Sequence, residues 1–249
     1  MTKKIDNKVF ISDFPFFSKE KLSLLKNIQE HLLEEKKLLV VYTPNAEQMV
    51  QTKQDPKFGT VLSRADILLA DGKGLVWANN WLNFLGKTRK IKQRIAGVDL
   101  VKDLLSFSKK KRLSAILIGG RGYEPNKLPD NLDWIEGYQK IAQPTKAEES
   151  DLKQHLVKQK PRIVFVAFGA PFQEKWIDQH RSWFEEAGVK LVMAVGGSFD
   201  VITGKLKRAP AWMQALGLEW LFRLIQQPWR WKRQLRLFKF IWLVIRASF

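Results

Sequence analysis

The stretch Val192-Met-Ala-Val-Gly-Gly-Ser-Phe-Asp200 begins as an apolar strand and breaks at two glycines. A buried strand that opens onto a Gly-Gly turn presents backbone N–H groups to an anion at the carboxyl edge of an α/β sheet. The chain then continues through Gly204-Lys-Leu-Lys-Arg-Ala-Pro210 into a basic, tryptophan-rich end. We therefore expect Val192–Asp200 to form the floor of an active site.

The same order of strand, polar turn and helix recurs along the chain. The strand-like segments are Leu38–Tyr42, Ile67–Ala70, Ser114–Ile118, Arg162–Phe168 and Lys190–Val195. Near-continuous apolar strands that alternate with helices indicate a parallel sheet covered on both faces. We predict an α/β fold with a Rossmann-like, mostly parallel sheet covered by helices over residues 1–204, and a basic amphipathic helical C-terminal appendage over residues 205–249.

Helical patterns fill most of the sequence between these strands, and Tyr123–Asp133, rich in Pro, Asn and Asp, predicts a loop. The predicted helices cover Ser18–Glu35, stretches that start near Ala46 and Leu75, Val98–Ser108, Glu148–Lys158 and the segment that carries Trp176 and Trp183.

The positive charge of the chain is concentrated at its C-terminal end. Residues 205–249 contain ten Lys or Arg against the single acid Glu219, which is half of the net charge of +18, and five of the ten tryptophans. From Trp229 onward, a helical projection groups Lys232, Arg233, Arg236, Lys239 and Arg246 on one arc and mostly large apolar residues on the other. This profile is typical of a helix that lies in a membrane interface. A terminal helix packed on the domain is the alternative, and nucleic-acid binding fits the apolar residues less well.

Composition also limits location and chemistry. The chain has no cysteine, which excludes disulfides and thiolate metal sites, and its N-terminus lacks an apolar segment of signal-peptide length. The apolar run Phe240–Ile245 is far shorter than the roughly 20 residues needed to span a bilayer. We expect a cytoplasmic protein that associates peripherally with the inner face of the cell membrane.

Each predicted strand ends in polar or glycine residues. Such residues also make tight turns and cap helices, but several sets at one sheet edge should converge on a site. Asp71 directly follows a buried strand and is our candidate general base, although it could simply cap the next helix. The residues at these ends are Thr43, Asn45, Asp71, Gly72, Gly74, Gly119, Gly120, Gly169, Gln173, Glu174, Gly196, Gly197 and Asp200.

The known ligand fingerprints are missing. Gly72-Lys-Gly74 lacks the third glycine of a dinucleotide motif, and no Walker-type sequence occurs. The three histidines, His31, His155 and His180, are scattered on polar helical stretches. We therefore predict neither a metal site nor a cofactor. Backbone N–H groups and arginines would then have to neutralise the charge of any bound diphosphate.

Taken in order, the motifs form a recognisable series. They are Thr43-Pro-Asn45, Asp71-Gly-Lys-Gly74, Arg94-Ile-Ala-Gly-Val-Asp99, Phe168-Gly-Ala-Pro-Phe-Gln-Glu174, Gly196-Gly-Ser-Phe-Asp200, Gly204, Arg208-Ala-Pro210, Gly217-Leu-Glu-Trp220, Arg223, Pro228 and Arg230. From about Leu38 to the C-terminus, the series resembles the WecG/TagA/CpsF family of bacterial glycosyltransferases. The resemblance implies inverting, metal-independent transfer of an N-acetylmannosamine-type sugar from a UDP donor to a polyprenyl-diphosphate-linked acceptor, in teichoic acid, common antigen or capsule synthesis.

The resemblance also implies roles for single residues. Asp71 corresponds to the catalytic base, with Thr43, Gln173 and Arg94 at the reacting centre. The remaining substrate-binding positions are Asn45, Gly72, Gly74, Tyr138, Gly169, Glu174, Gly196, Gly197, Asp200, Arg208, Glu219, Arg223, Arg230 and Arg233. Of these, Asp200 and the Gly196-Gly197 turn would hold the nucleotide, and the appendage arginines would meet the lipid diphosphate and the membrane.

Two features depart from the family pattern. Phe172 stands where lysine is usual, and the chain between Gly120 and Gly137 is short and lacks an expected helix. The competing interpretation of the sequence is a non-catalytic module that binds membranes or nucleic acid through the appendage of an α/β domain. Binding of a UDP-sugar would separate the two, and a nucleotide-dependent oxidoreductase is disfavoured by the missing fingerprint.

Overall fold

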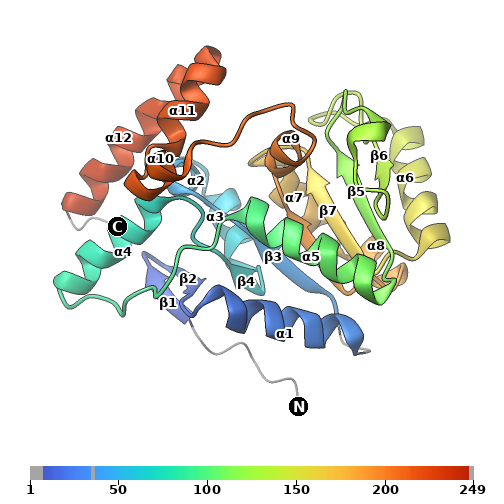
Figure 1. Ribbon diagram of the computed structural model, residues 1–249, viewed down its shortest axis with the longest axis horizontal. Coiled ribbons are helices and arrows are strands. Elements are labelled where there is room, and N and C mark those ends of the chain that lie inside the picture. Colours follow the sequence, from blue (N-terminus) through green and yellow to red (C-terminus); the bar gives the residue numbers. More distant parts are fainter. Residues whose placement is uncertain (1–7, 35–36, 247–249) are drawn as a thin grey trace.

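The computed structural model describes residues 8–34 and 37–246, in which eight strands form one sheet in the order β1-β2-β4-β3-β8-β7-β5-β6 (Figure 1). Neighbouring strands are parallel except for the antiparallel pair β1 and β2. The strands are β1 Lys8–Ile11, β2 Phe14–Phe17, β3 Leu39–Tyr42, β4 Ile67–Leu68, β5 Ala115–Gly119, β6 Asp133–Ile135, β7 Ile163–Ala167 and β8 Leu191–Ala194. The predicted α/β class with a mostly parallel sheet is confirmed.

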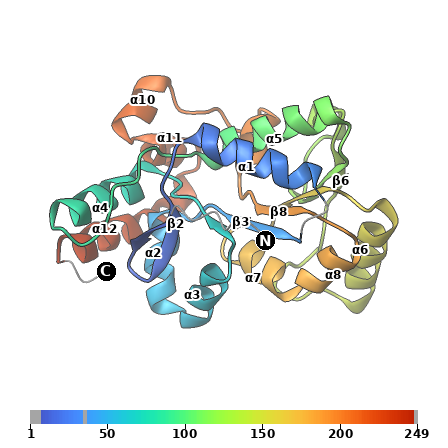
Figure 2. The same ribbon diagram turned by 90° about the horizontal axis from the view of Figure 1, so that it is seen from below.

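Helices cover both faces of the sheet (Figure 2). One face is covered by α2 Ala46–Gln54, α3 Pro56–Ser63, α4 Lys73–Phe84, α6 Lys146–Gln159, α7 Phe172–Gln179, α8 Arg181–Glu186 and α12 Trp231–Ile245. The other face is covered by α1 Lys21–Leu33, α5 Gly97–Lys111 and α9 Ser198–Ile202. Side chains of β3 alternate between the two cores, Val40 and Tyr42 in one and Leu39 and Val41 in the other, because successive strand residues point to opposite faces.

The adjacent strands β3 and β8 mark the point where the connections diverge. The helix after β3, α2, packs on one face of the sheet, whereas the helix after β8, α9, packs on the opposite face. A crevice therefore opens at the carboxyl ends of β3 and β8, which is where open α/β sheets bind their ligands.

Two parts of the sheet differ from the sequence prediction. The hairpin of β1 and β2 extends one edge through the pairing of Phe16 with Leu68, although the sequence analysis assigned no strand there. At the other edge, β6 begins at Asp133, where the predicted loop ends, and the loop contains the short 3-10 turn Pro125–Lys127. Both additions are short elements at the two ends of the sheet order.

The C-terminal segment forms α10 Ala211–Leu216, α11 Glu219–Gln226, the 3-10 turn Pro228–Arg230 and α12. Phe240 and Val244 on α12 are fully buried in the same core as Leu75 and Leu82 of α4. The prediction that the apolar arc of this helix faces a membrane is therefore wrong in part, because Val244 belongs to that arc and is buried in the domain core. No helix among the described residues is long and apolar enough to cross a membrane.

The basic arc predicted for α12 also needs correction. Arg233 and Arg236 face the domain, and both guanidinium groups lie within ion-pair distance of Glu47 on α2, at 2.6 and 3.3 Å. A row of large apolar side chains, each half or more exposed, lies along the side of α12 away from the domain, and the exposed Lys232 and Lys239 stand next to it. The residues of the apolar row are Trp231, Leu235, Phe238, Trp242 and Ile245. The division of the chain at residue 204 stays a prediction.

Candidate active site

A cavity of about 350 Å³ lies at the carboxyl ends of β3, β4, β7 and β8, in the crevice between β3 and β8. It has two walls. The sheet-edge wall is formed by residues of the strand ends and following turns, among them Thr43, Asn45, Asp71, Gly72, Gly74, Arg94, Gly169, Gln173, Gly196 and Gly197. The appendage wall is formed by residues after Gly204, among them Arg208, Glu219, Arg223, Arg230, Arg233 and Leu237.

Asp71 lies on the sheet-edge wall three residues after β4. Its backbone N–H donates to the carbonyl of Pro44 at 3.1 Å, and Gly72, with φ of +89°, turns the chain into α4. Burial raises the pKa of the Asp71 carboxyl above its ordinary value, and the Glu219 carboxylate adds to the rise, while Arg94 opposes it. A carboxylate with a raised pKa is a stronger base, which suits the removal of a hydroxyl proton.

Arg94 joins the two walls. Its Nη2 lies 3.7 Å from Asp71 Oδ1 and makes a close ion pair with Glu219 Oε2, from the first turn of α11. Glu219 was predicted to bind substrate, and in this structure it holds Arg94. The guanidinium beside Asp71 is thus fixed by a residue of the appendage.

Gln173 is oriented by hydrogen bonds at both ends of its amide. The backbone N–H of Gly196 donates to its Oε1 at 3.0 Å, and its Nε2 donates to Glu174 Oε1 at 2.9 Å. Glu174 is almost completely buried and also accepts from Gln48 Nε2, and burial raises its pKa. Glu174 does not line the cavity, so it acts on the site by orienting Gln173.

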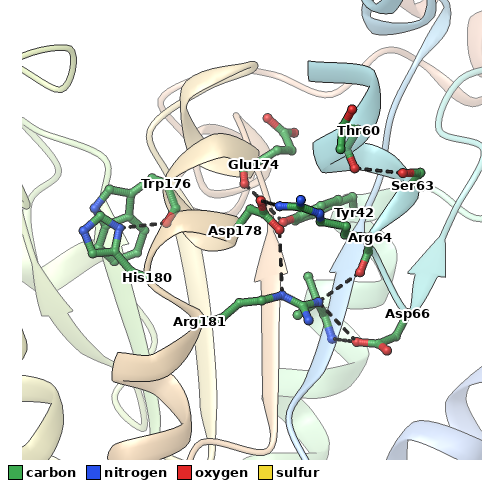
Figure 3. A network of polar contacts seen from close by, with 11 residues as sticks. Tyr42, Thr60, Ser63, Arg64, Asp66, Glu174, Trp176, Asp178, His180 and Arg181 are labelled. Carbon is green, nitrogen blue, oxygen red and sulfur yellow. Dashed lines mark hydrogen bonds and ion pairs between the residues drawn. The ribbon is translucent and has the colours of Figure 1, made fainter. Parts of the chain in front are cut away.

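A network of polar contacts behind the cavity fixes α7, which carries Gln173 and Glu174 (Figure 3). The Tyr42 hydroxyl donates to the carbonyl of Glu174 at 3.1 Å. Arg64 pairs with Asp178 of α7 at 2.8 Å, and Arg181 donates to the carbonyl of Arg64 at 3.0 Å. These contacts tie α7 to β3 and to the end of α3.

Small residues allow the elements of the site to approach one another. A Cβ added at Gly97, the first residue of α5, would lie 3.3 Å from Thr43 Oγ1. A Cβ added at Gly197 would collide with Arg223 Nη2, so the appendage arginine rests directly on the Gly-Gly turn. Asn45 caps α2 by accepting from Gln48 N at 3.1 Å, which leaves its amide group for the cavity.

Arg223 and Arg230 are the least neutralised arginines of the appendage wall, since Arg208 and Arg233 have close acidic partners. Burial lowers the pKa of Arg230 to about 10, and repulsion from Arg223 and Arg233 adds to this effect. Across residues 8–34 and 37–246, no acidic group lies within ion-pair distance of Arg230, and Arg223 approaches Asp200 only to 3.9 Å. Such a cluster fits a ligand with several anionic oxygens.

Arg208 has a structural role in this structure. Its two terminal nitrogens donate to the two carboxylate oxygens of Asp99 at 2.5 and 2.7 Å. The pair lowers the pKa of Asp99 and fastens the start of the appendage to the first turn of α5. Arg208 also lines the cavity, and its role in substrate binding stays a prediction.

Two predicted nucleotide contacts lie away from the cavity. Tyr138 is 2% exposed, stacks on Phe168 and accepts a hydrogen bond from Trp176 Nε1, so its placement does not support a nucleotide contact. Asp200 accepts from the Tyr123 hydroxyl at 2.9 Å and does not line the cavity, although it borders Arg223.

The sequence analysis missed several residues that line the cavity, namely Glu47, Lys73, Ser198, Lys207 and Gln234. Glu47 is the most important because it holds Arg233 and Arg236. The sequence could have indicated that Glu47 lies at the cavity, because it follows the candidate site residue Asn45 by two positions. In the part of the chain that the structure describes, no group of three or more His, Asp or Glu side chains could hold a metal ion.

A carboxylate, an amide and an arginine meet at the switch point of a Rossmann-like sheet, which is the set of groups that a group-transfer enzyme with anionic substrates would need. Comparison with known proteins specifies the class: the chain belongs to the Glycosyl transferase WecG/TagA/CpsF family, which it matches over residues 10–249. The protein is therefore a glycosyltransferase, the predicted family is confirmed, and the alternative of a non-catalytic module is ruled out.

Two curated relatives are similar over nearly the whole chain. Both are named N-acetylglucosaminyldiphosphoundecaprenol N-acetyl-beta-D-mannosaminyltransferase. The relative from Bacillus subtilis is 33% identical over 241 residues, which cover 96% of this chain and 91% of the relative. The relative from Bacillus spizizenii is 29% identical over 246 residues, which cover 95% of this chain and 90% of the relative.

Proposed function

We propose that this glycosyltransferase transfers N-acetylmannosamine from a UDP-sugar to an N-acetylglucosaminyl-diphosphate-undecaprenol acceptor. The names of the two relatives support the sugar and the acceptor. The observation that carries the proposal is the position of Asp71 and Arg94 on one wall of the cavity and of Arg223 and Arg230 on the other, where Arg230 has no acidic partner among the described residues.

In this mechanism, Asp71 takes the proton of an acceptor hydroxyl as the oxygen attacks the anomeric carbon of the donor. The bond between that carbon and the diphosphate oxygen breaks, UDP leaves from the opposite side, and the configuration inverts. Arg94 balances the charge next to Asp71, and the oriented amide of Gln173 can hold a sugar hydroxyl or the departing diphosphate.

The donor diphosphate is assigned to the Gly196-Gly197 turn. This turn lies between β8 and α9, so its backbone N–H groups lie at the sheet edge and Arg223 lies against it. Backbone N–H groups and an arginine can neutralise the leaving diphosphate without a metal ion. Asp200 contributes indirectly, because it borders Arg223 and is held by Tyr123.

The acceptor diphosphate is assigned to Arg223, Arg230 and Arg233 on the appendage wall. The exposed apolar side of α12 would then rest in the inner face of the cytoplasmic membrane, from which the acceptor's lipid emerges. Arg246 stacks over Trp242 at 4.1 Å, and Lys232 lies 5.7 Å from the ring of Trp231. Pairs of a cation and a tryptophan suit the boundary between head groups and acyl chains.

The test is transfer of radiolabelled sugar from UDP-N-acetylmannosamine to a short-chain prenyl-diphosphate-N-acetylglucosamine. Asp71→Asn should lower kcat by roughly 10²- to 10⁴-fold, because it removes the proton acceptor. Binding of UDP, measured by calorimetry, should change little. Asp13→Asn, in the turn between β1 and β2, is the matched control and should leave kcat unchanged. Near-complete activity of Asp71→Asn would show that another group is the base.

The identity of the donor is tested separately with a panel of UDP-sugars. N-acetylmannosamine should be transferred at the highest kcat/KM, with UDP-N-acetylglucosamine as the epimeric control. A higher kcat/KM for another donor sugar would contradict the proposed donor but leave the role of Asp71 intact.

A further inference from the structure

The segment between Asp71 and Asp99 has the composition that distinguishes the appendage. It contains six Lys or Arg residues and no acid over residues 72–98, together with Trp77, Trp81 and Phe84. Four of its cations follow α4 in the exposed part of the loop 86–93, namely Lys87, Arg89, Lys90 and Lys92. This segment belongs to the predicted catalytic domain, and the proposed function assigns no role to its outer side.

α4 has a buried side and an exposed apolar side. Leu75, Ala78 and Leu82 are almost completely buried against the sheet and α12. On the outside, Phe84 is 80% exposed, and Trp77 and Leu85 are each 41% exposed. Large apolar side chains are seldom grouped on the outside of a soluble domain, and exposed apolar patches mark interaction sites.

α4 and α12 lie side by side and run toward the same end of the molecule (Figures 1 and 2). A Cβ added at Gly74 of α4 would lie 3.8 Å from Leu237 of α12, so the helices are in contact near the cavity. The two helices that carry exposed apolar side chains are therefore neighbours.

We propose that α4 and the loop 86–93 form a second membrane-contact surface, which docks with α12 on an anionic lipid leaflet. This inference rests on the proposed function, in which α12 meets the membrane. The apolar side chains of α4 enter the head-group region, and the four loop cations meet lipid phosphates.

Charge favours a lipid leaflet over a second copy of this chain. Two copies facing each other through this surface would bring eight loop cations together with no acid from residues 72–98 between them. An anionic leaflet attracts the same groups, at about 1 kcal/mol for each basic residue near the surface. Cations beside tryptophan and phenylalanine are the arrangement expected at a membrane interface.

Two attached helices orient the enzyme in a way that one cannot. A single helix leaves rotation about its own axis free, whereas α4 and α12 together define a plane. Both helices also begin at the cavity, since Gly72 and Gly74 start α4 and Arg233 lies in the first turn of α12. Docking through both therefore holds the appendage wall at a fixed angle to the lipid surface.

The absence of cysteine allows a direct test with one environment-sensitive label. Phe84→Cys in the full chain, labelled with a nitrobenzoxadiazole dye, is mixed with vesicles of equal parts phosphatidylcholine and phosphatidylglycerol. We expect a blue shift and a several-fold rise in emission. Leu22→Cys, a 77%-exposed position on α1, is the matched control and should not respond. Phe238→Cys reports α12 in the same experiment.

The outcomes separate the inference from the proposed function. A response of Phe238→Cys without one of Phe84→Cys overturns the second surface and leaves the proposed function intact. Silence of both labels overturns membrane contact altogether, while transfer to a short-chain acceptor would still test the catalytic proposal. A concentration-dependent shift of the Phe84→Cys label without vesicles would mean self-association and would also overturn the inference.

A charge variant gives a second measurement. Lys87→Gln combined with Lys90→Gln should weaken vesicle binding by about fivefold for each lysine, and should leave kcat with a short-chain acceptor unchanged. Lys110→Gln combined with Lys111→Gln, on the exposed end of α5, should not alter vesicle binding. Equal losses from both double variants would show that only total charge matters and would overturn the second surface.

Discussion

The two walls of the cavity are built in opposite ways. On the sheet-edge wall, Gln173 is fixed by hydrogen bonds to Gly196, which follows a buried strand, and to Glu174. On the appendage wall, Arg233 extends from α12 and is held by an acid of the domain, Glu47. A rigid wall suits bond breaking, whereas the appendage wall suits capture of a charged group on a flexible lipid.

The difference shows that the appendage is part of the cavity, in addition to the membrane contact proposed for it. Glu219 holds Arg94 next to Asp71, and Arg223 rests on the Gly196-Gly197 turn. The sheet-edge wall is therefore complete only when the appendage is docked.

The largest expected effect comes from a change that weakens the packing of α12 on the domain. Phe240→Ala should lower the free energy of unfolding by about 3–5 kcal/mol, because it opens a hole in the core shared by α12 and α4. Urea denaturation followed by circular dichroism measures the change. Phe238→Ala, on the 62%-exposed side of the same helix, should change the free energy by less than about 0.5 kcal/mol. Equal losses would mean that α12 does not pack as described.

The next effect should be confined to the appendage wall. Arg230→Gln should raise KM for the prenyl-diphosphate acceptor by roughly 10- to 100-fold, since a charge-assisted hydrogen bond is lost, while the Kd of UDP stays nearly constant. Arg236→Gln is the control, because Arg236 pairs with Glu47 and does not line the cavity. A rise in the Kd of UDP without a change in acceptor KM would assign Arg230 to the donor.

A smaller effect, on the pH dependence of kcat/KM, tests whether Glu219 of the appendage wall influences Asp71 of the sheet-edge wall. Asp71 must be ionised to act, so kcat/KM should rise with pH through its raised pKa. Glu219→Gln removes a like charge and frees Arg94 to pair with Asp71, and both changes lower the pKa of Asp71. The acid limb of the pH profile should therefore move to lower pH.

Arg94→Gln should move the same limb in the opposite direction, because Asp71 loses the positive charge that favours its ionised form. If both variants shift the limb in the same direction, the limb does not report Asp71.

The smallest effect tests a contact inferred from the resemblance. Tyr138→Phe should leave the Kd of UDP within about twofold and cost about 1 kcal/mol of stability, because only the hydrogen bond from Trp176 is lost. Calorimetry and urea denaturation measure the two quantities. A tenfold loss of UDP affinity would reinstate Tyr138 as a nucleotide contact.

Much of the sheet-edge wall was predictable from the sequence, because parallel strands place their carboxyl ends at one edge. Thr43, Asp71, Gln173 and Gly196 follow four different strands and meet at one cavity. The edge strands were missed for the opposite reason. The strands β1 and β6 contain exposed or half-buried residues, so they lack the continuous apolar run that marked the buried strands β3, β4 and β8.

The appendage wall was predictable only in part. Its arginines were identified by charge, but their partners lie far away in sequence: Glu47 is 186 residues from Arg233, and Asp99 is 109 from Arg208. Helical periodicity could not tell which apolar residues of α12 meet the domain, because the buried Phe240 and Val244 are no more apolar than the exposed Phe238 and Ile245. Tyr138 shows the limit of a motif, since its hydroxyl is used by Trp176 in the core.

The ion pair between Glu47 and Arg233 also has a consequence for synthesis. The chain is made from its N-terminus, so Glu47 leaves the ribosome long before Arg233, and the last 45 residues take roughly 2–9 s to add at common rates. During that time the apolar sides of α2 and α4 lack the helix that covers them. The nascent chain therefore exposes these apolar sides until α12 has been synthesised, and a chain that stops near residue 230 would leave them uncovered.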